Sequence, residues 1–181
     1  MPPNKLRQSP PKPFPLTVHI RWMIRRDLPL VLNIEQEAFE FPWTEDEFIN
    51  TLRQRNCIGM VAELDGELVA FMVYLLEPRA LHLLSMAVAS GFRRRAIGLQ
   101  MMGKLRSKLA AQRRHSIVTL TRETNLPSQL FLRDNGFKAT SVVRNHWADT
   151  DEDAYVFRYS VATESPVENR LAMFFQADPP S

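Results

Sequence analysis

The stretch "LHLLSMAVASGFRRRAIGLQ" (residues 81–100) joins an apolar run to three consecutive arginines, followed three residues later by the glycine Gly98. The apolar run over 80–88 predicts a strand, and the pattern from about 96 to 112 predicts a long helix. A helix start presents backbone N–H groups that no helical bond uses, and the helix dipole adds partial positive charge there. Beside arginine side chains, such a junction favours an anionic ligand, in particular a phosphate, over a merely solvated basic turn.

The kind of phosphate ligand is narrowed by the motifs that the junction lacks. No G-K-[ST] follows the glycine, and no G-x-G-x-x-G is present in the chain. Nucleoside triphosphates and NAD are therefore poor candidates, because those motifs carry their usual binding loops. A diphosphate-bearing cofactor without these fingerprints points to coenzyme A.

The segments around the junction alternate between strand and helix patterns. Thr44 and Glu47 form a capping box, and Trp43 against Phe48 would form its hydrophobic staple. "DG" (65–66) predicts a tight hairpin turn. The predicted strands cover 18–24, 57–64, 67–76, 80–88, 116–122, 136–147 and 152–161, and the predicted helices 26–39, 41–54, 96–112 and 126–135. This order predicts an α/β (α+β) fold, a mixed sheet flanked by helices.

Length and composition predict one domain with appended ends. We expect a flexible proline-rich arm over 1–16, a domain over 17–161 and a C-terminal extension over 162–181. The single cysteine, Cys57, excludes an internal disulfide and a cysteine-rich metal site, so no metal is predicted. The start lacks the apolar core of a secretory signal, and no apolar run reaches the length of a membrane helix. We therefore expect a cytoplasmic protein without a membrane partner.

Charge is distributed unevenly along the chain, whose formal net charge is +3. Residues 93–95 and 104–114 are rich in basic side chains, whereas residues 35–47 and 149–153 are two clusters of acidic side chains. This asymmetry suits an anionic ligand on one side and a cationic acceptor on the other. The arginine run lacks interleaved aromatic residues, so direct nucleic-acid binding is not predicted.

The junction resembles the R-x-x-G-x-G/A motif of the GCN5-related N-acetyltransferases, with Arg93, Ala96 and Gly98 in its three places. Three further segments resemble the ribosomal-protein N-terminal acetyltransferase branch in the same order: "IEQEAFEFPWTEDEF" (34–48), "TRETNLPSQLFLRDNGF" (121–137) and "RNHWADTDEDAYVF" (144–157). The resemblance covers about residues 17–161. It implies the acyl-CoA N-acyltransferase fold of that family, with splayed fourth and fifth strands.

The resemblance also implies how acetyl-CoA binds as co-substrate. The pantetheine arm would pair with the strand at Met86, Ala87 and Val88, and Asn125 would bind the cofactor arm. The pyrophosphate would lie on the loop that begins at Arg93, on the N–H groups of Arg94, Arg95, Ala96, Ile97 and Gly98. Alanine at 96 departs from the motif: it costs nothing as a first helical residue, but on the order of 1 kcal/mol if the position needs a positive φ.

The catalytic groups of the resembled branch are missing. The places of its glutamate base and tyrosine acid are occupied by Leu120 and Leu132. His82 is the candidate replacement. It stands ten residues before Phe92, and the resemblance implies that some eukaryotic relatives carry a tyrosine base at the matching place. Alternation would place His82 on one strand face with Leu84, Met86 and Val88, and imidazole titrates near neutral pH. Glu123 is a weaker candidate, and an acyl-cysteine route through Cys57 is remote.

The acceptor is expected to meet aromatic side chains. The resemblance implies contacts from Phe41, Pro42 and Trp43 and from His146 with Trp147. The predicted activity is transfer of acetyl from acetyl-CoA to a protein N-terminal α-amine, with a basic ribosomal protein as one partner. Two alternatives stay open at this point: a small-amine acetyltransferase, and a non-catalytic CoA-binding regulator.

Overall fold

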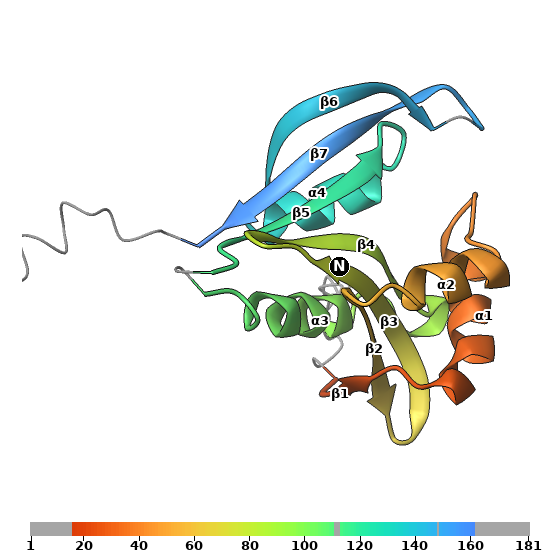
Figure 1. The fold of residues 1–181 in the computed structure, drawn as a ribbon. Helices are drawn as coiled ribbons and strands as arrows, with labels where there is room; N and C mark the ends of the chain where they lie inside the picture. The colour runs from red at the N-terminus through yellow and green to blue at the C-terminus, as the bar shows by residue number, and fades with distance from the viewer. Residues whose placement is uncertain (1–15, 111–112, 148, 162–181) are drawn as a thin grey trace, which may run out of the picture.

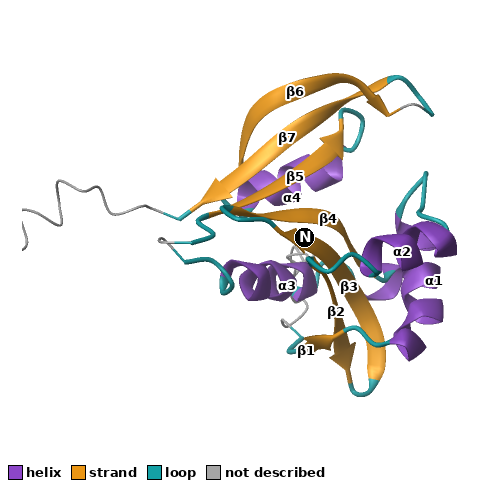
Figure 2. Ribbon diagram, in the orientation of Figure 1, coloured by secondary structure: helices purple, strands orange, loops and turns teal. Residues whose placement is uncertain are grey.

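A computed structural model describes residues 16–110, 113–147 and 149–161. The described strands form one sheet in the order β1-β2-β3-β4-β5-β7-β6 (Figures 1 and 2). The strands are β1 (His19–Trp22), β2 (Cys57–Leu64), β3 (Glu67–Leu76), β4 (Ala80–Val88), β5 (Ser116–Arg122), β6 (Lys138–Trp147) and β7 (Glu152–Ser160). The helices are α1 (Leu28–Ala38), α2 (Glu45–Leu52), α3 (Ile97–Arg106) and α4 (Leu126–Asp134), with short 3-10 turns η1 (Arg25–Asp27) and η2 (Ser90–Phe92).

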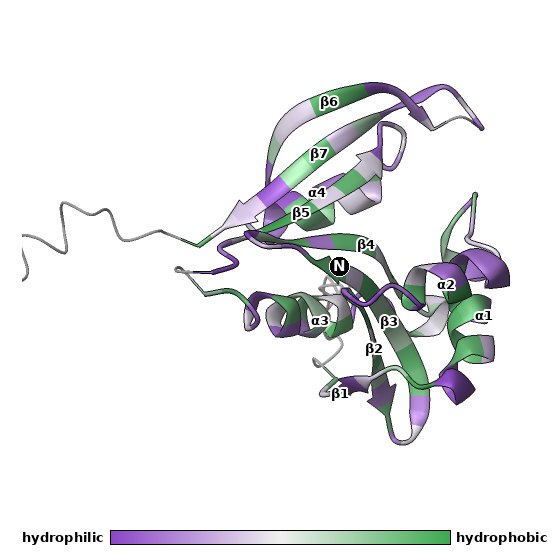
Figure 3. Ribbon diagram, viewed as in Figure 1, coloured by the Kyte–Doolittle hydropathy of each residue, from purple (hydrophilic) through white to green (hydrophobic). Residues whose placement is uncertain are grey.

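Two apolar clusters hold the helices against opposite faces of the sheet. Helices α3 and α4 pack on one face through residues such as Met101, Leu105 and Leu132. Helices α1 and α2 pack on the other through Val31 and Phe48, both fully buried. Strand β3 lies between the two clusters and is hydrophobic along most of its length (Figure 3). The mixed, helix-flanked sheet predicted from the sequence is confirmed.

Strands β4 and β5 run parallel but separate halfway along. Their pairing extends only over Ala80–Leu83 and Ser116–Thr119, after which the strands diverge (Figure 1). Beyond Leu83, the β5-facing edge of β4 therefore has no strand partner among the described residues. This is the expected splay between the fourth and fifth strands, and it opens a space inside the sheet itself.

A β-bulge in β4 changes which side chains share a face. Tyr74 pairs with Leu83 but Val73 pairs with Ser85, so Leu84 is an extra residue without a partner on β3. Leu84 packs on the α1 side, whereas Met86 and Val88 pack on the α3 side. The expectation that His82, Leu84, Met86 and Val88 share one face is wrong, because strand alternation does not continue through a bulge.

The predicted capping box at α2 is confirmed, and the predicted end of α3 is wrong. Thr44 accepts from the Glu47 N–H at 3.3 Å, and Trp43 and Phe48 meet with ring centroids 5.1 Å apart. Helix α3 ends at Arg106 rather than near residue 112. Just after this end, the Ser107 hydroxyl donates to the Lys104 carbonyl at 2.7 Å and so competes with the backbone hydrogen bond that would continue the helix.

The predicted ends of the chain are not part of the described structure. The arm predicted over 1–16 lies outside it except for Leu16, whose N–H donates to the Arg95 carbonyl at 3.2 Å. The extension predicted over 162–181 lies outside it entirely. Within residues 16–110, 113–147 and 149–161, no helix is long and apolar enough to cross a membrane.

Candidate active site

One end of the space between β4 and β5 is a cavity of about 300 Å³ beside the arginine loop. Its walls bring together residues from β4, the loop before α3 and the start of α4. They include Met86, Ala87, Val88, Arg93, Arg94, Gly98 and Asn125. Seven of the predicted cofactor residues therefore meet at one cavity.

The loop from Arg93 to Gly98 exposes its backbone donors as an anion site requires. Among the described residues, the N–H groups of Arg94 to Gly98 donate no hydrogen bond. The Arg93 Nε donates to the Val88 carbonyl at 3.0 Å, which ties the loop to the end of β4. Arg95 is exposed, and the Ile97 side chain is buried in the core, so these two residues offer backbone groups rather than cavity-lining side chains.

Ala96 adopts the conformation that glycine would provide. Its φ is 63° and ψ is 11°, in the left-handed region, directly before the first residue of α3. Ala96 therefore has the positive φ that the sequence analysis gave as the unfavourable case for an alanine at this position. Gly98 serves another purpose, since a Cβ there would lie 3.3 Å from the Phe131 ring. Its lack of a side chain lets α3 approach α4 closely beside the cavity.

Asn125 caps α4 and also lines the cavity. Its Oδ1 accepts from the Ser128 N–H at 3.1 Å, a standard N-cap contact. Its Nδ2 donates no hydrogen bond within the described residues and remains available to a ligand. One side chain can thus cap the helix and still serve the cofactor contact expected from the sequence.

A second cavity, of about 150 Å³, continues from the first toward the loop after α1. The two cavities share Phe39, Met86, Asn125, Ser128 and Phe131 in their walls. The second is lined mainly by aromatic and leucine side chains, among them Phe41, Trp43, Leu84, Leu120, Leu132 and Trp147. Two buried polar atoms of its lining residues, Thr121 Oγ1 and Trp147 Nε1, have no hydrogen-bond partner in the described part of the chain.

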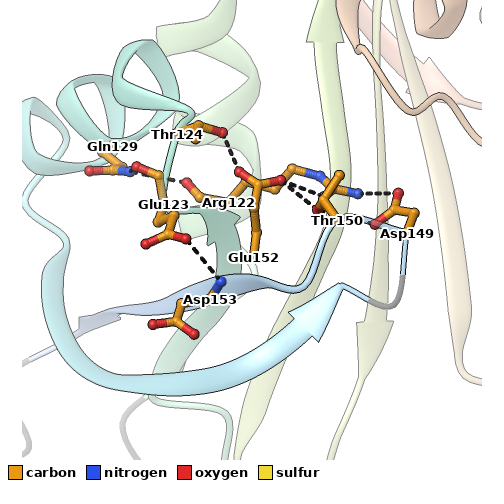
Figure 4. Close-up of polar contacts among 8 residues, drawn as sticks. All are labelled: Arg122, Glu123, Thr124, Gln129, Asp149, Thr150, Glu152 and Asp153. Carbon is orange, nitrogen blue, oxygen red and sulfur yellow. Dashed lines mark hydrogen bonds and ion pairs between the residues drawn. The ribbon is translucent and has the colours of Figure 1, made fainter.

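Arg122, at the end of β5, holds the outer wall of this second cavity together. Its guanidinium lies over the Phe41 ring at 4.3 Å and the Trp147 ring at 4.5 Å. The same group donates to Asp149 and Glu152, each at 2.7 Å, and to Thr150 at 2.8 Å (Figure 4). One side chain therefore links the α1–α2 loop, β5 and the β6–β7 connection, and we call this set the Arg122 clamp.

The acidic cluster at 149–153 is largely occupied by these contacts. Glu152 accepts from Thr124, Arg122 and Thr150, and these bonds lower its pKa to about 2. Asp149 pairs with Arg122, and Asp153 accepts from Arg144 and from the Asn145 N–H. These carboxylates therefore stabilise the wall of the cavity. Asp151 of the same cluster is exposed, as are Glu40, Glu45 and Asp46 of the α1–α2 segment.

The remaining predicted acceptor residues divide between wall and rim. Phe41, Trp43 and Trp147 line the second cavity, whereas Pro42 lies in the loop between two of them and is not part of the lining. His146 is exposed, and its ring packs edge-on against Trp147 at 4.6 Å. It contacts the wall from outside.

The structure does not bring His82 to either cavity. His82 belongs to the part of β4 that still pairs with β5, opposite Val118, and its Nδ1 lies 3.7 Å from the Glu77 carboxylate. Glu123 is also outside, where its Oε1 accepts from the Asp153 N–H at 3.4 Å. Leu120 and Leu132 do line the second cavity, at the places where the resembled branch has its base and acid.

A buried carboxylate that the sequence analysis did not select lines the same cavity. Glu35 in α1 is 2% exposed, and it accepts from the Trp43 N–H at 3.0 Å and from the Ser85 hydroxyl at 3.1 Å. Burial raises its pKa, against the effect of these two bonds. A signal was present in the sequence: Glu35 stands in the apolar stripe of α1 with Val31, Ile34 and Ala38.

Comparison with known proteins adds a family model and named relatives. The model of the acetyltransferase (GNAT) family matches residues 28–137. The ribosomal protein bS18-alanine N-acetyltransferase of Escherichia coli (strain K12) is 25% identical over 138 residues, covering 75% of this chain and 93% of that protein. The N-alpha-acetyltransferase of Sulfurisphaera tokodaii is 25% identical over 143 residues, covering 72% and 85%.

Among solved structures, the crystal structure of the ribosomal-protein-S18-alanine N-acetyltransferase from Escherichia coli matches with a TM-score of 0.73. The identity is 22%, and the match covers 83% of this chain and 97% of that one. At this identity the likeness concerns the fold.

Proposed function

Because the chain belongs to the acetyltransferase (GNAT) family and uses acetyl-CoA as co-substrate, we propose that its acceptor is the N-terminal α-amine of a protein. The observation that carries the proposal is the continuity of the two cavities, which share five wall residues. One cavity has the loop donors that suit a pyrophosphate, and the other has aromatic walls from two separate loops. An extended peptide end entering the second would meet the first at the splay of β4 and β5.

For the cofactor end, the proposal assigns the pyrophosphate to the loop Arg93–Gly98 and the pantetheine arm to the free edge of β4 at Met86–Val88. The unused N–H groups and the unpaired strand edge support this assignment. Acetyl-CoA should raise the melting temperature of the protein. Gly98→Glu should abolish that shift, because it puts a carboxylate and bulk beside the phosphates; a full shift in this variant would contradict the assignment.

For the acceptor end, the proposal assigns contacts to Phe41, Trp43 and Trp147. Two polar atoms of the lining residues, Thr121 Oγ1 and Trp147 Nε1, are buried in this wall without a hydrogen-bond partner in the described part of the chain. Aromatic side chains are enriched where proteins bind other polypeptides, so this aromatic wall favours a short peptide segment as the acceptor.

A basic ribosomal protein is the finer form of this proposal. The names of the Escherichia coli relatives motivate it, together with the exposed acids Glu40, Glu45 and Asp46 of the α1–α2 segment. A cytoplasmic site of action, where ribosomal proteins are made, goes with it.

The experiment is a turnover panel with acetyl-CoA. It compares peptides that share their first three residues but continue with basic or acidic residues, each beside a twin with a blocked N-terminus, and a set of small amines. The proposal expects turnover of free peptides only, faster for the basic series and slowed by salt. Turnover confined to small amines, or none at all, would reject the acceptor class. Equal rates for the two peptide series would reject only the basic partner.

A further inference from the structure

The second cavity, at the acceptor end of the site, contains one carboxyl group among its described lining residues, that of Glu35. The places where the resembled branch has a base and an acid, Leu120 and Leu132, line the same cavity and cannot exchange protons. Acetyl transfer still requires the attacking amine to lose a proton. The cavity itself therefore offers a proton acceptor that the sequence motifs do not indicate.

Ser85 connects this carboxylate to the open part of β4. Its hydroxyl donates to Glu35 Oε2 at 3.1 Å, and Ser85 itself lines the cavity with Leu84 and Met86. Ser85 directly follows the bulge at Leu84, in the part of β4 that no longer pairs with β5. The bulge turns Ser85 toward α1, where an unbroken strand would have directed it to the other face.

We infer that Ser85 and Glu35 form the proton path for the acceptor amine, with Ser85 in contact with the amine and Glu35 acting through it. This inference rests on the proposed acetyl transfer. In the step, the amine nitrogen attacks the thioester carbon, so a C–N bond forms and the C–S bond breaks. The amine proton passes to Ser85 Oγ while the Ser85 proton passes to Glu35 Oε2. The CoA thiolate leaves and takes a proton from water or from the newly protonated Glu35.

The surroundings of Glu35 suit a group that must gain and lose a proton. Burial raises the pKa of Glu35, and the nearby Glu47 carboxylate of α2 raises it further, while the Trp43 N–H and the Ser85 hydroxyl lower it. Among the described lining residues of the same cavity, Arg122 from β5 is the one cationic group, and the β4 partner Ser85 is uncharged. A base whose pKa lies closer to the working pH is the more effective catalyst.

A purely structural role for Glu35 makes a different prediction. Its bond to the Trp43 N–H ties α1 to the aromatic loop, so losing it could simply loosen the acceptor wall. Glu35→Gln separates the two roles, because the amide oxygen can still accept from Trp43 and the amide NH₂ can donate to a reoriented Ser85 hydroxyl. The variant retains the contacts and loses the ability to accept a proton.

The experiment measures turnover of a free-N-terminus peptide against pH for wild-type protein and for Glu35→Gln, Ser85→Ala and Ser85→Thr. We expect Glu35→Gln and Ser85→Ala to lower kcat by roughly 10²–10⁴-fold. The acidic limb of the wild-type pH profile should change in Glu35→Gln to that of the peptide amine's own titration, and Ser85→Thr should recover much of the rate. The acetyl-CoA-induced melting shift should be retained in all of them. Glu37→Gln, an exposed carboxylate on the same helix that accepts from Ser90, is the matched control.

Two results would overturn the inference while leaving the acetyl transfer in place. The first is a Glu35→Gln protein with near-normal kcat and an unchanged pH profile. The second is a large loss in His82→Ala with normal turnover in Ser85→Ala, which would move the role to the imidazole. A wild-type protein that acetylates no peptide would instead reject the proposed function.

Discussion

The alanine at position 96 occupies a backbone conformation that costs free energy. Its φ of 63° lies where L-residues are disfavoured and glycine is not. We predict that Ala96→Gly raises the free energy of unfolding by about 1 kcal/mol. Ala89→Gly is the control, because Ala89 has a φ of −52° and should lose stability on the same exchange. Urea unfolding of the three proteins measures this, and a less stable Ala96→Gly would contradict the account of the loop.

At the residue scale, the sequence predicted local motifs better than isolated side chains. The loop Arg93–Gly98 and Asn125 could be predicted from the sequence, because the spacing of their residues is fixed within one strand–helix junction and one helix cap. Glu35 was missed, because its burial depends on Ser85, 50 positions away in the chain. His82 was selected as a titratable group at a place suggested by the family resemblance, and it lies in the part of β4 that still pairs with β5.

Among the elements, the Arg122 clamp joins the two loops that form the acceptor wall. Its side chain is 18% exposed and satisfies two carboxylates and two aromatic rings at once. We predict that Arg122→Gln lowers the free energy of unfolding, because it leaves Asp149 and Glu152 without their cation and removes the contacts with both aromatic rings. It should also raise KM for the peptide while the acetyl-CoA melting shift is retained, because the clamp is at the acceptor end.

Arg144 provides the matched control for the clamp. It pairs with Asp153 from the neighbouring strand, but its side chain is 80% exposed. Arg144→Gln should therefore lower the free energy of unfolding by less than about 1 kcal/mol and leave KM for the peptide unchanged. Equal effects of the two substitutions on KM would show that the clamp has no special part in acceptor binding.

The same elements set a pH dependence of stability in acid. The pKa of Glu152 is about 2 in the folded protein, below the value of about 4.3 for an unperturbed glutamate. A lowered folded pKa contributes stability that is present above the unfolded pKa and is lost as pH falls toward the folded one. We predict loss of stability between about pH 4.3 and 2, seen in melting temperatures across that range.

Glu152→Gln should flatten this acid dependence, whereas Glu67→Gln should leave it unchanged. Glu67 is exposed at the start of β3, away from the clamp. An equally steep acid loss in Glu152→Gln would show that other carboxylates, such as Asp149 and Asp153, carry the effect.

At the element scale, the sequence predicted the strands and the capped helix α2 because alternation and capping boxes are local signals. The end of α3 was predicted too late, because the basic residues after Arg106 continue the helical pattern while Ser107 ends the helix through its own hydrogen bond. The separation of β4 from β5 was predicted only through the family resemblance. Residue patterns do not say where two parallel strands separate.

For the whole molecule, the site exists because segments distant in sequence close around the splay in the sheet. The wall of the acceptor cavity combines α1 and its loop, β4, β5, α4 and the end of β6. The predicted acceptor residues came from two of these segments, the loop after α1 and the end of β6, whereas Ser85 of β4 and Leu120 of β5 come from others. Such convergence depends on the register of the whole sheet, so no single stretch of sequence reports it.

The central claim is that acetyl goes from acetyl-CoA to a protein α-amine. The most direct measurement uses one peptide with a free N-terminus and one internal lysine, incubated with the protein and acetyl-CoA and then sequenced by tandem mass spectrometry. The account predicts acetyl on the α-nitrogen alone, and no product from a twin peptide whose N-terminus is blocked. Acetyl on the lysine ε-nitrogen, with the α-amine left free, would contradict it.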